Sequence, residues 1–213
     1  MNLSYEKDNK ERIPYEHYLE EYRGIDPKEA SIRSGIPYDA DNQRFCLRML
    51  GQEFYLSWPE FEAVRVKEAE EVYAPILTET SAKIMAIRMI VHGVLADSTG
   101  KFLTYREVPW GNVYLQQFTG RCINRLAFTY GNRIPEFCSI MERMGAKKQS
   151  FGDASYEFEF INGYWVRFIL WAGDEEFSPS AQILFSDNFP LSFQAEDMAV
   201  VGDITIGAMK KWQ

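Results

Sequence analysis

Two runs of residues that flank Asn162-Gly163 constrain the fold more than any other part of the sequence. Aromatic residues alternate with glutamates over residues 156–160, which is the pattern of a strand with one buried face. Residues 165–171 are dense in aromatic and branched side chains, which favour strands. Because Asn-Gly readily adopts the positive φ angles of a tight turn, the sequence predicts an antiparallel hairpin here.

Other segments predict further strands. Arg44 to Leu50 and Glu53 to Trp58 are expected to pair as a hairpin joined at Gly51-Gln52. Ala181 to Phe185 follows the hairpin at Asn162-Gly163 and predicts a third strand of a meander.

Helical spacing and end signals predict several helices. The sharpest start is Asp26-Pro27, where Asp26 is the expected N-cap and Gly35 the expected stop. The predicted helices cover residues 10–23, 26–35, 78–97, 111–130, 135–144 and 196–211. The apolar stripe expected on the 78–97 helix comprises Ile84, Ile87, Val91, Val94 and Leu95.

The order of these elements predicts an α+β fold: an antiparallel sheet of hairpins and a meander, packed with several helices. Strands and helices are grouped and do not alternate as βαβ units, which argues against a parallel sheet. No linker or internal repeat is present, so residues 1–213 are predicted to form a single domain. Residues 1–25 are expected to be a helical extension packed on the body formed by residues 26–213.

The composition excludes several classes of protein. Hydrophobic residues make up 46% and charged residues 25% of the chain, which disfavours disordered and membrane classes. The net charge of -8 argues against nucleic-acid binding, because neutralising phosphates requires clustered Lys and Arg. Residues 1–10 lack the apolar core of a signal peptide, so we expect a cytoplasmic location and no membrane partner. The odd, sparse set Cys46, Cys122 and Cys138 fits a reducing compartment and cannot form a cysteine-only metal site.

The first candidate site follows the strand that ends at Trp171. Asp174, Glu175 and Glu176 are consecutive carboxylates at a glycine turn, and carboxylates at the end of a rigid strand suit a cation or a cationic ligand. Consecutive side chains diverge, so at most two of the three can reach one ion. The alternative is an ordinary solvated turn.

Two other groups of polar residues are candidates. His92 and Arg88 lie one helical turn apart, and an imidazole can transfer protons or ligate a metal near neutral pH. Arg106 and Glu107 precede the rigid bend Pro109-Trp110-Gly111, where Arg can bind an anion and Trp offers a stacking face. The alternative for His92 is a residue at the edge of the core, and for Arg106 and Glu107 a structural ion pair.

No motif identifies a reaction. The chain has no phosphate-binding loop, no Gly-x-Gly-x-x-Gly, no His-Glu-x-x-His and no Gly-x-Ser-x-Gly. Whether the protein is an enzyme, which cofactor it uses and its oligomeric state therefore stay open.

Several short runs, taken in order, resemble domain of unknown function 3786 (DUF3786), a family from anaerobic bacteria and archaea. The resemblance covers roughly residues 25 to 210, and its most specific part is Trp171-x-Gly-Asp-Glu-Glu-Phe177. The other parts are Arg106-Glu107-Val108-Pro109-x-Gly111, Tyr114, Phe118, Gly152-Asp153-Ala154 and Ile183-Leu184-Phe185. Some members carry a cysteine-rich segment of the iron–sulfur type, which this chain lacks, so the resemblance implies no cluster. It implies no activity, but it favours a shared ligand site formed by Trp171, Asp174, Glu175, Glu176, Arg106, Glu107 and His92.

Three functions are compatible with the sequence. The preferred hypothesis is a protein that binds a small ligand or cation at the acidic turn. A metal-assisted hydrolase or transferase, with His92 moving protons, is the second. The third is an interaction module of an anaerobic redox or methyl-transfer system, for which Tyr15, Tyr18, Tyr22, Trp110 and Trp212 would form an exposed patch.

Overall fold

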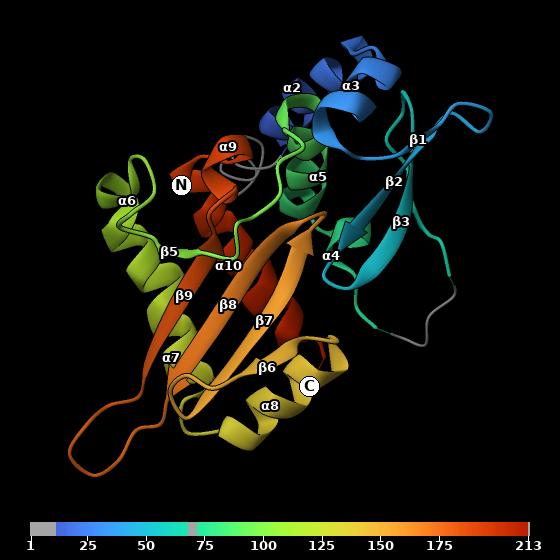
Figure 1. Ribbon diagram of the computed structural model, residues 1–213. Helices are drawn as coiled ribbons and strands as arrows, with labels where there is room; N and C mark the ends of the chain where they lie inside the picture. The colour runs from blue at the N-terminus through green and yellow to red at the C-terminus, as the bar shows by residue number, and fades with distance from the viewer. Residues whose placement is uncertain (1–11, 68–71, 213) are drawn as a thin grey trace, which may run out of the picture. The chain divides into compact units, whose positions relative to one another are not determined.

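The computed structural model describes residues 12–67 and 72–212, so residues 1–10, in which no signal peptide is expected, lie outside the described residues. The chain divides into two compact units, one up to Leu95 and one from Ala96 onward (Figure 1). Each unit combines helices with antiparallel strands, which confirms the predicted α+β class. The single-domain organisation stays a prediction.

The helices of the first unit are α2 (Ile13–Gly24), α3 (Pro27–Ser34), α4 (Pro75–Thr78) and α5 (Thr80–His92). The predicted limits of α3 are confirmed. The Asp26 carboxylate accepts hydrogen bonds from the backbone N–H groups of Lys28 and Glu29, and Gly35 ends the helix at a φ of 71°. The described part of the predicted 10–23 helix is also helical, as α2.

The strands of the first unit are β1 (Tyr38–Asp39), β2 (Arg44–Met49), β3 (Gln52–Ser57) and β4 (Ala63–Arg65). The predicted hairpin is β2–β3, paired from Arg44↔Ser57 to Met49↔Gln52. Its turn residues are Leu50 and Gly51, both with positive φ, one residue earlier than predicted. β1 pairs with β2 and β4 with β3.

The helix predicted over Thr78 to Asp97 is wrong in its limits and in its buried face. The chain breaks at Glu79, whose extended backbone separates α4 from α5, and α5 ends at His92 before Gly93. Val94 and Leu95 lie beyond the helix and are exposed. The buried face consists largely of alanines and methionines and not of the expected branched side chains, because both residue types pack well in helices. It comprises Ala82, Met85, Ala86, Ile87, Met89 and Ile90.

The second unit contains an antiparallel sheet in the order β7–β8–β9–β5, with β6 paired to β7. Its strands are β5 (Phe102–Thr104), β6 (Lys147–Gln149), β7 (Ala154–Ile161), β8 (Tyr164–Trp171) and β9 (Ser180–Ser186). The hairpin at Asn162-Gly163 is confirmed as β7–β8, and the predicted third strand is β9. The short strands β5 and β6 were not predicted, because neither has a run long enough to read as a strand.

The helices of the second unit are α6 (Gly111–Phe118), η2 (Thr119–Asn124), α7 (Arg125–Tyr130), α8 (Ile134–Arg143), α9 (Phe189–Ser192) and α10 (Ala195–Met209). α6, η2 and α7 follow one another without a break and match the helix predicted over 111–130. The middle turn, η2, is a π-helix, a wider turn that often marks an inserted residue. The predicted helices 135–144 and 196–211 correspond to α8 and α10.

α10 is the centre of the second unit. It lies against the sheet and against the α6–η2–α7 run (Figure 1). Most of its residues are buried, including Val201, Ile204 and Ile206. The one acid in its middle, Asp203, accepts hydrogen bonds from Arg121 and, at 3.2 Å, from Arg125 Nη1. These two arginines lie four residues apart on the facing run, so they approach the same carboxylate.

Two glycines of α10 allow a matched test of this packing. A Cβ on Gly202 would lie 2.7 Å from Cys122 Sγ, whereas a Cβ on Gly207 would meet nothing closer than 3.8 Å. We expect Gly202→Ala to lower the free energy of unfolding by about 1 kcal/mol or more, because overpacking outweighs the helix propensity of alanine. Gly207→Ala should raise it by about 0.5–1 kcal/mol. Urea denaturation followed by circular dichroism measures both, and equal effects of the two variants would contradict the packing described.

Candidate functional site

The acidic turn after β8 is folded around its own first carboxylate. Asp174 Oδ1 accepts hydrogen bonds from the backbone N–H groups of Glu176 at 2.8 Å and Phe177 at 2.7 Å. The Asp174 N–H donates to the Phe177 carbonyl at 2.9 Å. The bonds from Phe177 and Glu176 lower the pKa of Asp174 below its ordinary value of 3.8, since they favour the charged form. Asp174 therefore stabilises the loop first of all.

Glu175 and Glu176 extend from the same turn with exposed side chains. A shallow hollow of about 490 Å³ lies beside them, lined by Asn132 and residues 173–179. None of its lining residues is basic. The carboxylates of this hollow can bind a cation, but the hollow has no basic side chain that could bind an anionic group.

Trp171 and the turn are tied to the loop before β7. The Asp153 carboxylate accepts a hydrogen bond from the Ala172 N–H at 2.7 Å, and the Asp153 N–H donates to the Leu170 carbonyl. Gly152 has a φ of 57°, and a Cβ there would lie 2.6 Å from the Leu170 carbonyl oxygen. Two of the runs that resemble DUF3786 thus meet at the end of β8, where they fix the chain direction into the acidic turn.

His92 belongs to the first unit and is part of a group of polar side chains between α2 and α5. Its Nε2 lies 2.9 Å from Glu21 Oε2, and His17 Nε2 lies 3.3 Å from the other oxygen of Glu21. One turn earlier, Arg88 binds the Tyr18 hydroxyl and lies over the Tyr18 ring at 5.1 Å. The polar edge of α5 therefore holds α2, which is the structural alternative considered for His92.

Arg106 and Glu107 have separate surroundings. Glu107 Oε2 accepts hydrogen bonds from the Thr104 N–H at 2.7 Å and the Thr104 hydroxyl at 2.9 Å, which lower the pKa of Glu107. No ion pair joins Arg106 to Glu107 among the described residues, and the Arg106 side chain is exposed. Neither residue lines the hollow at the acidic turn. Ligand binding by Arg106, Glu107, His92 and the acidic turn stays a prediction.

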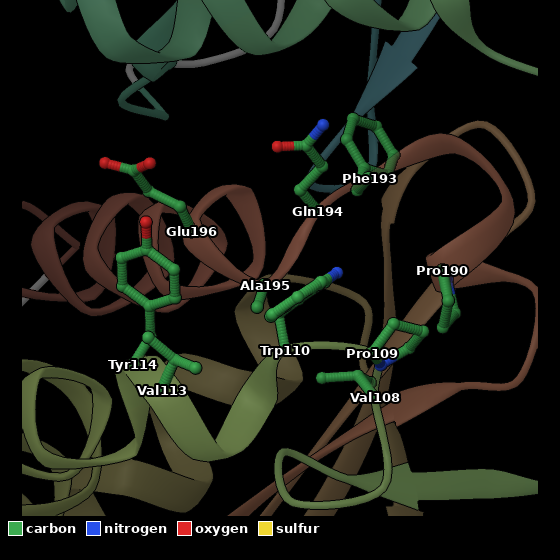
Figure 2. Close-up of a pocket in the computed structure, with 10 residues that line it drawn as sticks. All are labelled: Val108, Pro109, Trp110, Val113, Tyr114, Pro190, Phe193, Gln194, Ala195 and Glu196. Carbon is green, nitrogen blue, oxygen red and sulfur yellow. The ribbon is translucent and has the colours of Figure 1, made fainter.

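The second unit contains another hollow, which is lined mainly by apolar and aromatic side chains. Two segments enclose a pocket of about 430 Å³, the bend before α6 and the chain from α9 into α10. Figure 2 shows its lining side chains, with the Tyr114 hydroxyl directed toward Glu196. The lining residues are Val108, Pro109, Trp110, Val113, Tyr114, Pro190, Phe193, Gln194, Ala195 and Glu196.

The bend that carries Trp110 is anchored at both ends. Tyr105 donates its hydroxyl hydrogen to the Ala195 carbonyl at 2.6 Å and stacks on Phe118 with ring centroids 3.8 Å apart. Burial raises the pKa of Tyr105, so the hydroxyl stays protonated as a donor. Gly111 is required because a Cβ would lie 1.8 Å from the Tyr105 carbonyl oxygen. These contacts therefore fix the backbone conformation of the run from Tyr105 to Gly111.

Trp110 is the unusual residue of this pocket. Its backbone is left-handed, with a φ of 63°, which costs a residue other than glycine about 1–2 kcal/mol. Its side chain is 78% exposed and Val113 is 64% exposed, so burial does not offset that cost. The Pro-Trp-Gly bend is the part of this pocket that the sequence pointed to, and its stacking role stays a prediction. Nothing in the sequence linked residues 190–196 to the bend.

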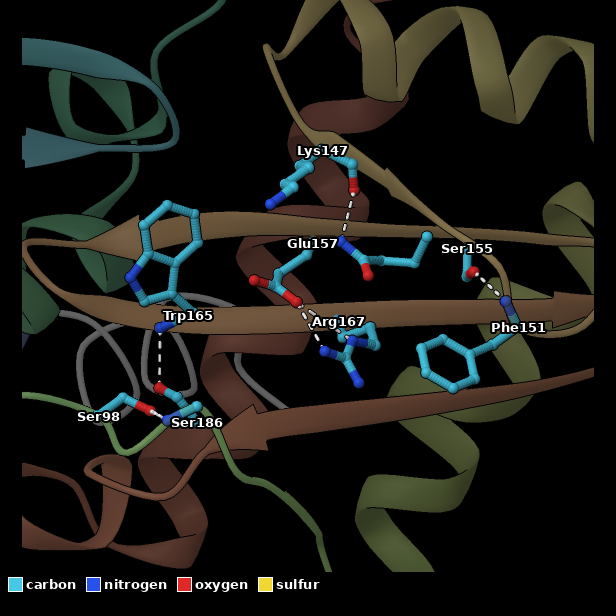
Figure 3. A network of polar contacts seen from close by, with 10 residues as sticks. Ser98, Lys147, Phe151, Ser155, Glu157, Trp165, Arg167 and Ser186 are labelled. Carbon is cyan, nitrogen blue, oxygen red and sulfur yellow. Dashed lines mark hydrogen bonds and ion pairs between the residues drawn. The ribbon is translucent and has the colours of Figure 1, made fainter.

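A polar cluster on the sheet was also missed. Arg167 on β8 forms a half-buried ion pair with Glu157 on β7, at 2.7 Å from Nη2 to Oε2. Its guanidinium group lies 3.9 Å from the ring centroid of Phe102 and 4.9 Å from that of Phe151. Figure 3 shows Glu157, Arg167 and Trp165 on the same face of the strands. The cross-strand register Glu157↔Arg167 explains the pair. A two-residue turn at Asn162-Gly163 alone would place Glu157 opposite Phe168, but an irregularity between Glu159 and Ile161 shifts the register by one residue.

The described residues contain neither a cluster of metal ligands nor a membrane-spanning helix. In residues 12–67 and 72–212, no three His, Cys, Asp or Glu side chains lie together so that they could hold a metal ion. No helix within those ranges has both the length and the apolar character needed to cross a membrane.

Comparison with known families identifies the family of this chain. The family described as "Domain of unknown function (DUF3786)" matches residues 26–208. The chain belongs to the DUF3786 family. No curated protein and no solved structure matched it in the corresponding comparisons. The resemblance read from the short motifs is thereby confirmed.

The two hydrogen bonds that Asp174 accepts predict how the acidic turn responds when this carboxylate is removed. Asp174→Ala should speed hydrogen exchange of the Glu176 and Phe177 amides severalfold, because both lose their acceptor. The folded pKa is lowered, so the stabilisation is present above the ordinary value and is lost only as pH falls through the lower folded value. Exchange measured by mass spectrometry tests this, with Glu175→Gln as the control. Equal exchange in both variants would contradict the assignment.

Proposed function

We propose that the protein binds a small organic molecule in the pocket between the Pro109-Trp110 bend and the start of α10. The observation that carries the proposal is Trp110, a large aromatic residue held in a left-handed backbone with its side chain exposed at the pocket wall. Folding gains nothing evident from this arrangement. Strained residues that persist at a concave surface are typical of ligand sites.

The size and lining of the pocket support the proposal. Its volume of about 430 Å³ lies in the range of small-molecule sites, which are mostly apolar with a few polar groups. Phe193 forms part of a rigid wall, because it packs edge-on against Tyr164 at 5.3 Å and contacts Phe189 at 5.6 Å. Tyr114, Gln194 and Glu196 provide the polar groups that can orient a ligand.

The family motif contributes to the same pocket. Val108, Pro109 and Tyr114 belong to the run that resembles DUF3786, and all three line the pocket. Gly111 of that run permits the close approach to Tyr105. The motif therefore forms the frame of the pocket, and Trp110 fills the position that the motif leaves open.

The three functions that are compatible with the sequence differ in how much support they have. The acidic turn is a second candidate for a cation, because Glu175 and Glu176 border its hollow and their side chains are exposed to solvent. A metal-assisted hydrolase lacks a group of three candidate ligands in the described part of the chain. The interaction module stays a prediction with less support, since two of the five aromatic residues named for its patch, Tyr22 and Trp212, are buried. The cytoplasmic location and the lack of nucleic-acid binding stay predictions.

Removal of the indole tests the proposed function. We expect Trp110→Gly to abolish binding of fluorinated fragments (amines, alcohols and carboxylic acids) that bind wild type in fluorine NMR. The variant should keep its free energy of unfolding within about 1 kcal/mol of wild type, because relief of the left-handed strain offsets the added chain entropy.

Phe177→Gly is the matched control. Phe177 is an exposed loop aromatic, 69% accessible, that does not line the pocket. Fragments should bind this variant as they bind wild type. If no fragment distinguishes Trp110→Gly from Phe177→Gly, the pocket is not a ligand site.

A further inference from the structure

The charged side chains at the pocket indicate which class of ligand it can bind. Glu196 is the one lining residue with a formal charge, and its side chain is exposed at the rim. No Lys, Arg or His lines the pocket. Asp197, next to Glu196 in the first turn of α10, adds a second carboxylate that accepts a hydrogen bond from the Gln194 N–H at 2.9 Å. A ligand with an anionic group would meet the Glu196 carboxylate without a basic partner.

Helix dipoles reduce this negative potential but do not reverse it. The N-terminal ends of α6 and α10 both border the pocket, and each carries a partial charge of about +0.5. Together they offset about one of the two carboxylates, Glu196 and Asp197. The balance at the pocket is therefore close to one negative charge.

The aromatic walls define the kind of cation. Trp110, Tyr114 and Phe193 line the pocket, and the faces of aromatic rings attract cations, with Trp the strongest. Compact metal ions require about six oxygen ligands, whereas this pocket is mostly apolar. A substituted ammonium group is weakly hydrated and suits both the rings and the carboxylate.

We propose that the pocket binds an organic cation, a quaternary or alkylated ammonium group, which contacts the aromatic walls and is paired with Glu196. This inference rests on the proposed function, because it concerns the same pocket and specifies its ligand class. The ammonium group would lie against the Trp110 indole, and the remainder of the ligand would occupy the apolar surface of Pro109 and Val113.

The test compares two probes of the same shape. Choline carries a trimethylammonium group, and 3,3-dimethyl-1-butanol carries an uncharged tert-butyl group in its place. We expect choline to bind the full chain at least about ten-fold more tightly in NMR titrations, because only the cation gains from the rings and the carboxylate. Trp110→Gly should abolish binding of both probes.

Two variants with the same change of charge locate the interaction. Glu196→Gln should weaken choline binding about five-fold and leave the alcohol unaffected, because only the cation is attracted by the carboxylate. Glu176→Gln removes an exposed acid that does not line the pocket, and it should change neither probe. Thermal unfolding of each variant verifies that it is folded.

The outcomes separate the two proposals. If both probes bind equally and lose binding in Trp110→Gly, the pocket binds small molecules but the cation inference is wrong. If Glu176→Gln weakens choline as much as Glu196→Gln does, the cation binds at the acidic turn or through general charge, and the inference is again wrong. If neither probe binds at tens of millimolar, the inference is overturned, while the fragment measurement still decides the proposed function.

Discussion

Burial of α10 is the constraint on which the second unit depends. A helix with apolar residues on all sides must be covered on all sides, so it requires both a sheet and other helices as neighbours. The β7–β8–β9 meander covers one side with its alternating aromatic residues, and the α6–η2–α7 run covers another. Asp203 is tolerated within this helix because two arginines of the covering run neutralise it.

The candidate pocket is a consequence of the same packing. Once α10 is fixed, the hydrogen bond from Tyr105 to Ala195 fixes the bend before α6 against the first turn of α10. The bend is too tight for side chains at Gly111, and the residue before it takes a left-handed conformation. The hollow therefore forms where a rigid bend meets a helix end.

The sequence predicted the features that depend on neighbours in the chain. The Asn162-Gly163 turn and the Asp26 cap are decided within a few residues, and both were correct. The end and buried face of α5 were wrong, because its partners are distant in sequence and its core residues are alanine and methionine. The candidate site was recognised only in part. The Pro109-Trp110 bend has local signals, whereas residues 190–196 reach the same pocket only through tertiary packing.

The π-turn η2 lies between the helix that lines the pocket, α6, and the helix that packs in the core, α7. A π-turn accommodates one residue more than an α-turn, and one residue rotates a helix by about 100°. α6, which carries Tyr114 and Val113, is therefore turned relative to α7, which packs on the sheet. A homologue without the extra residue would keep the hydrophobic interior of α7 yet turn a different side of α6 toward the pocket. Insertion or deletion at this position would thus change the wall of the pocket without a change in the core.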